Sequence, residues 1–470
     1  MGQTQMNNSD NQTIVALATP HGTGGIAVIR LSGPGAFSVL DKCWSGKPVE
    51  SFPSHTVHLG WIRDNSGENI DNVVVTVYRA PNSYTGENVA EISCHGSVWV
   101  QQAVVNRLIE CGARAAEGGE FTRRAFMNGR LDLAQAEGVA DMIAASSKAA
   151  ARLAATQMKG EFSRKLDSLR SGLIDLGSLL ELELDFSEEE VEFADRSRLI
   201  ALSDEIKAVV DRLADSFRAG NAFKNGVPVA IVGAPNVGKS TLLNALIGEE
   251  RAIVSAIPGT TRDIIEVTLE IDGILFRFFD TAGIRDTEDP IEKIGVERAR
   301  QKLSEAAVVL CLTDKPGEEI VLAPIVSSCC TEEGTRHILH LLTKSDLHTV
   351  FPDGKTQEKN PCGKSKEGSL AISALTGAGI PELKKALVDI ATADYNPQQE
   401  LIVTNARHYE ALKLASEALS RLIEGLQSGI PSDFLAQDLR EATHHLGTIT
   451  GSVTSDDLLH TIFARYCIGK

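Results

Sequence analysis

The sequence predicts an α/β multidomain protein: an N-terminal α/β domain, an all-α helical domain, and a second α/β domain with a mainly parallel sheet inserted into the helical one. Three observations lead to this prediction. Short β-rich runs alternate with helical stretches over 13–125, whereas strand signals vanish between about 130 and 220. Strands and helices alternate again over 226–390, which is typical of a parallel sheet. Helical patterning returns after 400, so we expect the two helical blocks to form one domain around the inserted module.

The predicted domain boundaries follow these changes of pattern. The N-terminal domain covers 1–125, the helical domain covers 126–225 and 391–470, and the inserted domain covers 226–390. Within the first domain, 13–17, 26–31 and 73–78 are predicted strands and 98–110 is a predicted helix. In the helical domain, leucines at three- and four-residue steps predict an amphipathic helix: Leu166, Leu169, Leu173, Leu176 and Leu180. Two later helices are predicted over 412–426 and 434–446.

Composition suits a globular protein of the cytoplasm. The chain has 470 residues, of which 43% are hydrophobic and 23% are charged, and no apolar run approaches the ~20 residues of a membrane span. The first ten residues are polar and do not resemble a signal peptide. Eight cysteines are scattered without a Cys-x-x-Cys pair, which predicts a reducing compartment, no structural zinc and no disulfide framework.

The chain is acidic, with a formal net charge of −17. Such a charge disfavours broad nonspecific binding to nucleic acid, so a nucleic-acid partner would need a local basic patch or a second protein to hold it. Arg123, Arg124 and Arg130 form one candidate patch, and a solvated helix face is the alternative interpretation of the same residues.

A phosphate-binding loop opens the inserted domain. Residues 233–240 read Gly-Ala-Pro-Asn-Val-Gly-Lys-Ser and match the complete G-x-x-x-x-G-K-[ST] pattern. An apolar run at 229–232 precedes the loop as a predicted strand, and 241–247 follows it as a predicted helix, which is the setting that this loop needs. Lys239 would reach the β- and γ-phosphates of a nucleotide, and Ser240 would ligate Mg²⁺.

The residues downstream indicate a Ras-like GTPase domain. A strand at 276–279 ends in Asp280-Thr281-Ala282-Gly283, where the Asp would hold Mg²⁺ indirectly and the Gly would meet the γ-phosphate. Further strands are predicted at 308–312 and 338–342, and the second ends in Thr343-Lys344-Ser345-Asp346. This resembles the Asn-Lys-x-Asp motif that selects guanine, with Thr343 in place of Asn. Ser373, Ala374 and Leu375 resemble the loop whose backbone contacts guanine O6.

Hydrolysis of GTP requires a positioned water molecule. Ile284 stands where Ras-type proteins have a Gln, and its side chain has no polar group to orient water. The polar candidates just downstream are Glu288, Asp289 and Glu292. No arginine is obviously placed as a finger, although Arg262 and Arg285 are near in sequence; the Asn236 carbonyl oxygen offers a monovalent cation a place beside the phosphates.

Four further patterns carry a family resemblance over essentially the whole chain. They are the glycine-rich segment 18–33, the segment Tyr84-Thr-Gly-Glu87 to Gly96, the segment 119–137, and the C-terminal Cys467-Ile-Gly-Lys470. Together with the GTPase motifs, they resemble the MnmE (TrmE) family of tRNA-modification GTPases, which belongs to the TrmE-Era-EngA type.

The resemblance implies an activity, cofactors and partners. The family modifies the wobble uridine of certain tRNAs together with an FAD- and NADH-binding partner of the MnmG type, and a tetrahydrofolate derivative (5-formyl- or methylene-tetrahydrofolate) supplies the one-carbon unit. GTP hydrolysis to GDP depends on K⁺, and the protein acts as a homodimer, with a heterotetramer expected with the partner. The N-terminal domain would bind folate and contribute to dimerisation.

The resemblance also assigns residues. It places K⁺ among Asn236, Ser255, Ile257 and Thr260, Mg²⁺ at Ser240 and Thr261, and catalytic roles at Glu292 and Cys467. It implies that folate binds at Arg30, Glu91, Arg130 and Lys470; Arg130 stands where a known member has Lys, and Thr23 where Arg is frequent. The full set expected to bind GTP is Asn236, Val237, Gly238, Lys239, Ser240, Thr241, Ser255, Ala256, Ile257, Pro258, Gly259, Thr260, Thr261, Asp280, Thr281, Ala282, Gly283, Thr343, Lys344, Ser345, Asp346, Ser373, Ala374 and Leu375.

Two other functions share the same GTPase motifs. A regulatory K⁺-dependent GTPase in ribosome assembly would use them, but such proteins typically append a small RNA-binding domain, whereas this chain has the folate-type segments and the Cys-Ile-Gly-Lys tail. The second of these functions is that of a dimeric scaffold that binds GTP without turnover, and negligible hydrolysis would distinguish it.

Overall fold

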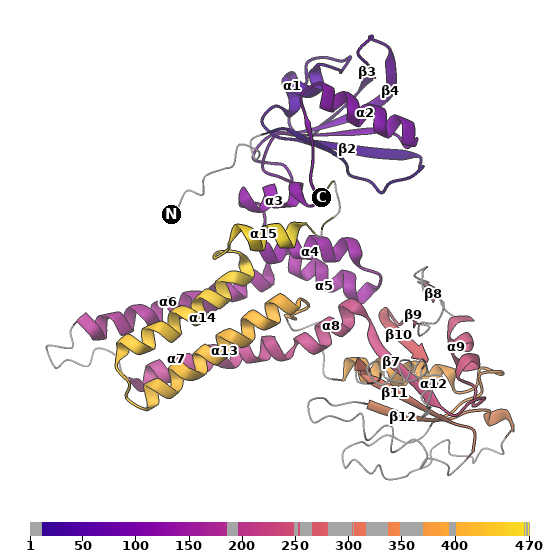
Figure 1. Ribbon diagram of the computed structural model, residues 1–470, viewed down its shortest axis with the longest axis vertical. Helices are drawn as coiled ribbons and strands as arrows, with labels where there is room; N and C mark the ends of the chain where they lie inside the picture. Colours follow the sequence, from indigo (N-terminus) through magenta and orange to yellow (C-terminus); the bar gives the residue numbers. More distant parts are fainter. Residues whose placement is uncertain are drawn as a thin grey trace, which may run out of the picture. The chain divides into compact units, whose positions relative to one another are not determined.

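The computed structural model describes residues 12–185, 196–248, 252–253, 266–280, 303, 305–315, 337–347, 370–393, 401–464, 466 and 469. The chain forms two compact units, each assembled from segments that are distant in sequence. The first comprises Met1–Ala140, Gln157–Ser178 and Arg440–Lys470, and the second comprises Asp141–Thr156 and Leu179–Leu439. Each unit contains one β-sheet together with helices, which confirms the predicted α/β multidomain class (Figure 1). The predicted domain boundaries stay predictions.

The first unit is built on a six-stranded sheet in the order β3-β4-β5-β2-β1-β6. Its strands are β1 (Ile14–Leu17), β2 (Ile26–Ser32), β3 (Thr56–Arg63), β4 (Asn69–Tyr78), β5 (Val89–His95) and β6 (Arg114–Ala115). The first five pair antiparallel with their neighbours, and β6 pairs parallel with β1. The strands expected over 13–17, 26–31 and 73–78 are therefore confirmed.

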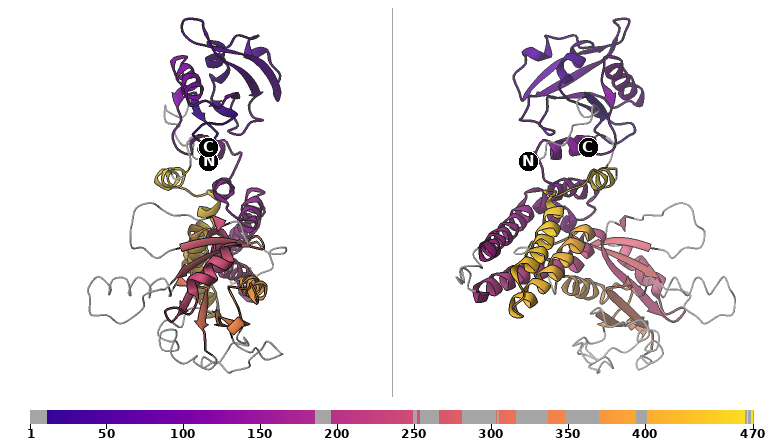
Figure 2. Two further views of the ribbon diagram at one scale, coloured as in Figure 1. Left: turned by 90° about the vertical axis from the view of Figure 1, so that its right-hand side faces the viewer. Right: turned by 60° about the vertical axis from the view of Figure 1, so that its left-hand side comes forward.

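One face of this sheet is buried because its residues alternate in character. Val73, Val75 and Val77 of β4 are fully buried, and Ile29 and Leu31 of β2 join them in the core. Helix α2 (Val98–Glu110) packs on β1, β2, β4 and β5, and Figure 2 shows it beside the sheet. Helix α1 (Ala36–Asp41) and the short helix η1 (Val49–Ser51) follow β2. The Ser97 hydroxyl caps α2 by accepting from the Val100 N–H, so the helix begins where the sequence predicts.

Further helices complete the first unit. They are α3 (Glu120–Met127), α15 (Asp456–Phe463) and parts of α4 (Leu133–Ala144), α5 (Lys148–Met158), α6 (Glu161–Asp185) and α14 (Ser432–Thr450). Leu133, Ala136, Leu459 and Phe463 form a small core in which residues far apart in the chain meet. The predicted leucine stripe of α6 is confirmed, because Leu166, Leu169, Leu173, Leu176 and Leu180 are all buried.

The second unit contains a seven-stranded sheet in the order β13-β12-β11-β7-β10-β9-β8. The strands are β7 (Val227–Gly233), β8 (Ala252–Ile253), β9 (Glu266–Ile271), β10 (Ile274–Asp280), β11 (Val308–Thr313), β12 (His337–Leu342) and β13 (Leu370–Ala371). The pairs among β10, β7, β11, β12 and β13 are parallel, whereas β9 and β8 add an antiparallel edge. The mainly parallel sheet is thus confirmed.

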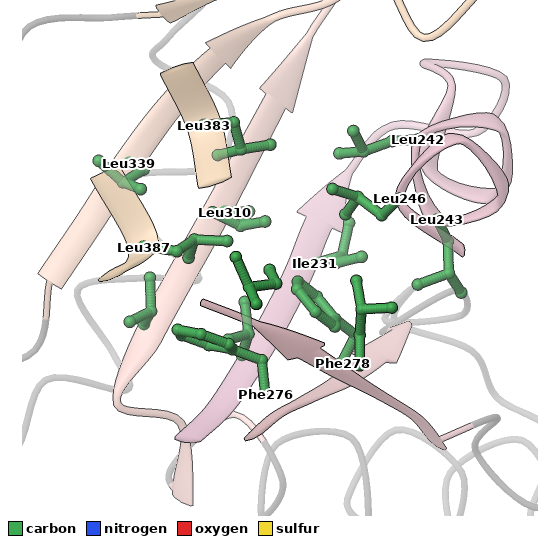
Figure 3. Close-up of a cluster of buried hydrophobic side chains, with 14 of the residues drawn as sticks. Ile231, Leu242, Leu243, Leu246, Phe276, Phe278, Leu310, Leu339, Leu383 and Leu387 are labelled. Carbon is green, nitrogen blue, oxygen red and sulfur yellow. The ribbon is translucent and has the colours of Figure 1, made fainter. Parts of the chain in front are cut away.

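A continuous apolar core covers one face of this sheet (Figure 3). Helices α9 (Lys239–Gly248) and α12 (Ile380–Thr392) contribute Leu242, Leu246, Leu383 and Leu387 to it. The two leucines of each helix are four residues apart, so each helix presents one apolar stripe to the strands. The strands offer side chains such as Ile231 and Leu310 in return, and the core thereby fixes where α9 begins relative to the end of β7.

Three helices flank the second sheet in the sequence: α7 (Arg196–Asp215) and α8 (Phe217–Asn225) before β7, and α13 (Ala406–Gln427) after α12. Helices α7 and α13 run antiparallel side by side (Figures 1 and 2). Their arrangement is fixed at both ends: the Phe217 and Tyr409 rings stack with centroids 4.7 Å apart, and Arg196 Nη2 donates to Ile430 O.

Candidate functional site

The phosphate-binding loop has the backbone that its glycines require. Strand β7 ends at Gly233 and α9 begins at Lys239. Gly238 has φ +105°, a left-handed conformation that favours glycine, and Asn236 has φ +63°. At Gly233 a Cβ would lie 2.8 Å from Leu312 O, so no side chain fits between the two strands.

Lys239 and Ser240 lie in the first turn of α9, where backbone N–H groups are unpaired and the helix dipole favours an anion. Lys239 Nζ donates to Gly233 O at 2.8 Å and to Ala234 O at 3.2 Å, so its ammonium lies along the loop. Ser240 is exposed. A lysine, a hydroxyl and a helix N-terminus in this arrangement fit a nucleotide phosphate with Mg²⁺.

Thr343 connects two of the predicted nucleotide-binding loops. Its side chain follows β12 and is only 4% exposed. Thr343 Oγ1 donates to Val237 O in the phosphate-binding loop at 2.7 Å, and to Thr313 O at the end of β11 at 3.1 Å. The hydroxyl therefore ties the ends of β7, β11 and β12 together, a role that the sequence analysis did not foresee for this departure from Asn.

Asp346 and Ser373 are brought together by neighbouring strands. Ser373 Oγ donates to Asp346 Oδ1 at 2.6 Å, and Ser345 N donates to Ile372 O at 3.1 Å. The carboxylate is thus oriented at the end of the sheet by a hydroxyl that is itself buried. A fixed carboxylate can accept a pair of N–H donors from one edge of a guanine, which adenine lacks.

An ion pair supports the same loops. Lys344, which has φ +57°, places its Nζ 2.8 Å from Asp314 Oδ2 after β11. The hydrogen bond from Lys344 holds the pKa of the Asp314 carboxyl below its ordinary value. Ala374 and Leu375 follow in the next loop, where the Leu375 side chain is exposed.

Several predicted site residues lie outside the described residues. They are Ser255, Ala256, Ile257, Pro258, Gly259, Thr260, Thr261, Thr281, Ala282, Gly283, Glu292, Cys467 and Lys470. Asp280 is the last residue of β10 and is paired with Ile231 of β7, two residues before Gly233. Among the residues that the structure describes, no cluster of three or more His, Cys, Asp or Glu side chains is arranged to hold a metal ion.

In the first unit, the structure brings together Arg30 and Glu91, two of the predicted folate-binding residues. They lie directly opposite each other on β2 and β5. Arg30 Nε and Nη2 both lie 2.9 Å from Glu91 Oε1, and Arg30 Nη1 donates to Gly469 O at 3.5 Å. Arg30 thus contacts the C-terminal tail from the sheet.

Arg130 lies against Gly86, whereas Arg124 corrects an expectation. The Arg130 side chain is exposed, and its Cγ would lie 3.2 Å from a Cβ at Gly86. Arg124 is 4% exposed and is paired with Glu87 at 3.2 Å and with Glu120 at 2.9 Å. An arginine that is buried and neutralised by two carboxylates does not belong to an exposed basic patch, so this part of the predicted patch is wrong.

The remaining neighbours of Arg30 were not predicted. Tyr84 and Phe121 place their rings 5.0 and 5.7 Å from the guanidinium carbon. Tyr84 belongs to one of the quoted sequence patterns, but only the fold brings it and Phe121 of α3 to the same side chain of β2. Sequence spacing carries no signal for such a contact between distant segments.

Comparison with known proteins identifies the family. The model of the GTP-binding protein TrmE N-terminus matches residues 13–130, and the model of the MnmE helical domain matches residues 133–467, a span that contains the inserted module. The tRNA modification GTPase MnmE of Cytophaga hutchinsonii is 47% identical over 470 residues, covering 99% of each chain. The chain belongs to the MnmE family of tRNA modification GTPases.

Two further relatives are also named tRNA modification GTPase MnmE. The MnmE of Parabacteroides distasonis is 47% identical over 97% of this chain and 100% of the relative, and that of Bacteroides fragilis strain ATCC 25285 is 48% identical over 98% and 100%. Among solved structures, the G domain of the T. maritima FeoB iron transporter covers 35% of this chain and 99% of that one, at 24% identity and a TM-score of 0.26. That score adds nothing to the MnmE assignment.

Membership in the MnmE family confirms two predictions, the family itself and the enzyme class, a GTPase. Within the described part of the chain, none of the helices has the length and apolar character needed to cross a membrane.

Proposed function

We propose that this chain is a K⁺-dependent GTPase that installs a carboxymethylaminomethyl-type group at C5 of the wobble uridine of certain tRNAs. It would act with an FAD- and NADH-binding partner of the MnmG type, and a one-carbon tetrahydrofolate would supply the carbon. The observation that carries the proposal is the presence of two sites in one chain: the oriented nucleotide loops around Thr343, and the Arg30–Glu91 pair that contacts the C-terminal tail.

In the GTPase site, each described residue has a role that its position supports. Lys239 would bind the β- and γ-phosphates, Ser240 would hold Mg²⁺ with Thr261, and Asp346 would accept from guanine. Asn236 would share K⁺ with Ser255, Ile257 and Thr260. Glu292 would orient the attacking water, because Ile284 has no polar group to do so. Asp280 would hold Mg²⁺ through water.

The residues of the N-terminal site fit a reduced folate. A folate carries carboxylates and pterin N–H groups, so it needs both a cation and an anion from the protein. The guanidinium of Arg30 and the carboxylate of Glu91 provide them side by side, and Arg130, Lys470 and Cys467 would complete the site. When bound, the folate supplies the one-carbon unit; the chain's own residues bind and orient it.

The partners follow from the same proposal. A homodimer in the cytoplasm would pair with the MnmG-type protein as a heterotetramer. Because the chain carries a net charge of −17 and Arg124 is buried, the tRNA would be held mainly by that partner. We also propose the domain boundaries given above, with the folate site in 1–125 and the GTPase in 226–390.

Nucleoside mass spectrometry of tRNA tests the modification. Cells that lack this chain are expected to lose the aminomethyl-type wobble uridine, and the wild-type chain is expected to restore it. Lys239→Ala and Arg30→Ala, which address the two sites separately, should each fail to restore it. An unchanged wobble uridine in the deleted cells would refute the modification role and leave an assembly GTPase as the alternative.

The hydrolysis mechanism has its own test. GTP turnover is expected to be much faster in K⁺ than in Na⁺, and Glu292→Ala should abolish fast turnover while sparing nucleotide affinity. Equal rates in the two salts would remove the cation from the mechanism, and an unchanged rate for the Glu292 variant would remove that carboxylate.

A further inference from the structure

Two aromatic rings lie against the guanidinium of Arg30. Its carbon is 5.0 Å from the centroid of Tyr84 and 5.7 Å from the centroid of Phe121. Tyr84 comes from the segment between β4 and β5, and Phe121 from the first turn of α3, so three separate elements meet at one cation. Distances below about 6 Å place both rings within the range of a cation–π contact.

Both rings are themselves held in place. Phe121 is fully buried in a small cluster with Ile14 and Ala16 of β1, and Tyr84 packs against the same cluster. The Tyr84 hydroxyl lies 2.8 Å from Thr122 Oγ1, and burial raises the pKa of this phenol. A ring anchored at its hydroxyl end presents a fixed face to its neighbour.

Arg30 retains hydrogen-bonding capacity despite these contacts. Its side chain is 12% exposed, and three of its five N–H groups point at Glu91 Oε1 and at Gly469 O. Among the described residues, no hydrogen bond engages the other two. A long side chain with so many rotamers would lose its alignment if only the bond to one carboxylate oxygen held it.

We propose that Tyr84 and Phe121 are positioning residues that fix the plane of the Arg30 guanidinium for a ligand with carbonyl or carboxylate acceptors. The inference rests on the proposed function of this site, in which that ligand is a reduced folate. Neither ring needs to touch the ligand: each acts through Arg30, by removing the orientations in which the guanidinium would miss its acceptor.

Tyr84 offers a graded set of variants. Tyr84→Phe keeps the ring face and loses only the hydroxyl contact with Thr122. Tyr84→Leu keeps apolar bulk and removes the face. Because Tyr84 is only half-buried, the leucine variant is expected to fold, and unchanged thermal unfolding and GTP turnover would verify this. Phe121→Leu provides an independent second variant at the other ring.

The test is isothermal titration calorimetry of the full chain with 5-formyl-tetrahydrofolate. Arg30→Gln is expected to weaken affinity by about tenfold or more, Tyr84→Leu by about three- to tenfold, and Tyr84→Phe by less than about twofold. The decisive comparison combines Tyr84→Leu with Arg30→Gln: if the ring acts through Arg30, the double variant binds no more weakly than Arg30→Gln alone.

Each other outcome has a separate meaning. Full affinity in Arg30→Gln would refute the folate assignment of the site, and the inference would fall with it. Weak binding in Arg30→Gln together with full affinity in both leucine variants would overturn the inference about the rings and leave the folate assignment intact. Additive losses in the double variant would also overturn it, because they would show that Tyr84 contacts the ligand or supports the fold independently of Arg30.

Discussion

Thr343 shows at the residue scale how a departure from a motif is accommodated. Asn is usual at this position, and the threonine hydroxyl instead donates to Val237 O and Thr313 O in a nearly buried setting. Thr313 O also accepts from the Thr343 N–H at 2.8 Å, so it keeps a partner without the hydroxyl. The contact with Val237 O is therefore the one that links the guanine-type loop to the phosphate-binding loop.

Thr343→Val is expected to weaken nucleotide binding. Valine keeps the shape of threonine but leaves Val237 O without this donor, and a lost buried hydrogen bond of this kind lowers affinity by about three- to tenfold. Thr343→Ser keeps the hydroxyl and should bind within about twofold of the wild type. Equilibrium titration with a fluorescent GDP analogue measures both. Equal affinities for the valine and serine variants would show that the bridge does not matter for binding.

Glu120 makes the N-terminal domain sensitive to acid. Its carboxylate is buried and accepts from Arg114 Nη2 at 2.6 Å, from Arg124 Nη2 at 2.9 Å and from Glu117 N at 2.9 Å. Burial by itself raises the pKa of this group, but these hydrogen bonds outweigh it and hold the pKa below the ordinary value of 4.5. The stabilisation is thus fully present above pH 4.5 and is lost as the pH falls through the lowered value.

Glu120→Gln should therefore cost stability at neutral pH and cost progressively less below pH 4.5. The three tryptophans all lie in the N-terminal domain, so their fluorescence during urea unfolding reports on this domain: Trp44, Trp61 and Trp99. Glu117→Gln changes an exposed carboxyl in the same turn and serves as the control. A difference between wild type and Glu120→Gln that stays constant from pH 7 to pH 3 would contradict the proposed protonation.

At the residue scale, the sequence predicts the chemical role of a side chain better than it predicts which other side chains surround it. The phosphate-binding and guanine-type motifs predict a nucleotide site with Lys239 and Asp346, and the family resemblance implies a folate site with Arg30 and Glu91. The prediction failed for Arg124, whose partner Glu87 lies on a distant segment. A side chain's charge is visible in sequence, whereas the carboxylates that neutralise it depend on the tertiary fold.

At the element scale, the β9–β10 hairpin caps helix α5 within the second unit. The Ala149 N–H donates to Gly273 O at 3.0 Å, and the Lys148 N–H donates to Glu270 Oε1 at 3.2 Å. These N–H groups belong to the first turn of α5, where no helical partner exists, and a carboxylate there also complements the helix dipole. The hairpin connects the segment before 266, which carries the predicted site residues Ser255 to Thr261, with the segment after 280, which carries Thr281, Ala282 and Gly283.

Glu270→Ala is expected to loosen the start of α5. Loss of a capping acceptor typically costs about 1 kcal/mol, which corresponds to roughly fivefold faster exchange of the amide hydrogens in the first turn. Hydrogen exchange read by mass spectrometry over 147–153 measures it. Glu266→Ala is the matched control, because this carboxylate lies on the same strand but pairs with Arg277. Identical exchange in the two variants would show that Glu270 does not cap the helix.

A helix or strand could be predicted from the sequence where its hydrophobic pattern was long enough to repeat. The apolar run 229–232 lies in β7, because a strand buried on both faces is apolar throughout. The leucine stripe lies in α6, because a helix buried on one face repeats apolar residues every three or four positions. Strands β6, β8 and β13 have two residues each and carry no such signature. They exist because a longer neighbouring strand offers hydrogen bonds, which is a property of the assembled sheet.

At the scale of the whole molecule, the two ends of the described chain meet in the first unit. Gly469 lies against β1, where a Cβ would be only 2.2 Å from Leu17 O, and its φ is +97°. Gly118 and Gly119 similarly leave room for the backbone of Phe463 and Tyr466. The contact between Arg30 and Gly469 therefore joins residues that are 439 positions apart in the chain.

Gly469→Ala therefore tests whether the tail belongs to the N-terminal site. The new methyl group would overlap Leu17 O, displace the tail and remove the contact with Arg30 Nη1, so folate affinity is expected to fall by about tenfold. GTP turnover should be unchanged, because the phosphate-binding loop folds within the other unit. The control is Gly67→Ala. Gly67 has φ +87°, but no atom lies within 4 Å of where its Cβ would be. This variant therefore has the backbone strain of an alanine at positive φ without a steric overlap. If both alanine variants bind 5-formyl-tetrahydrofolate equally well in calorimetry, the tail contact contributes nothing to the ligand, and Arg30 and Glu91 bind it on their own.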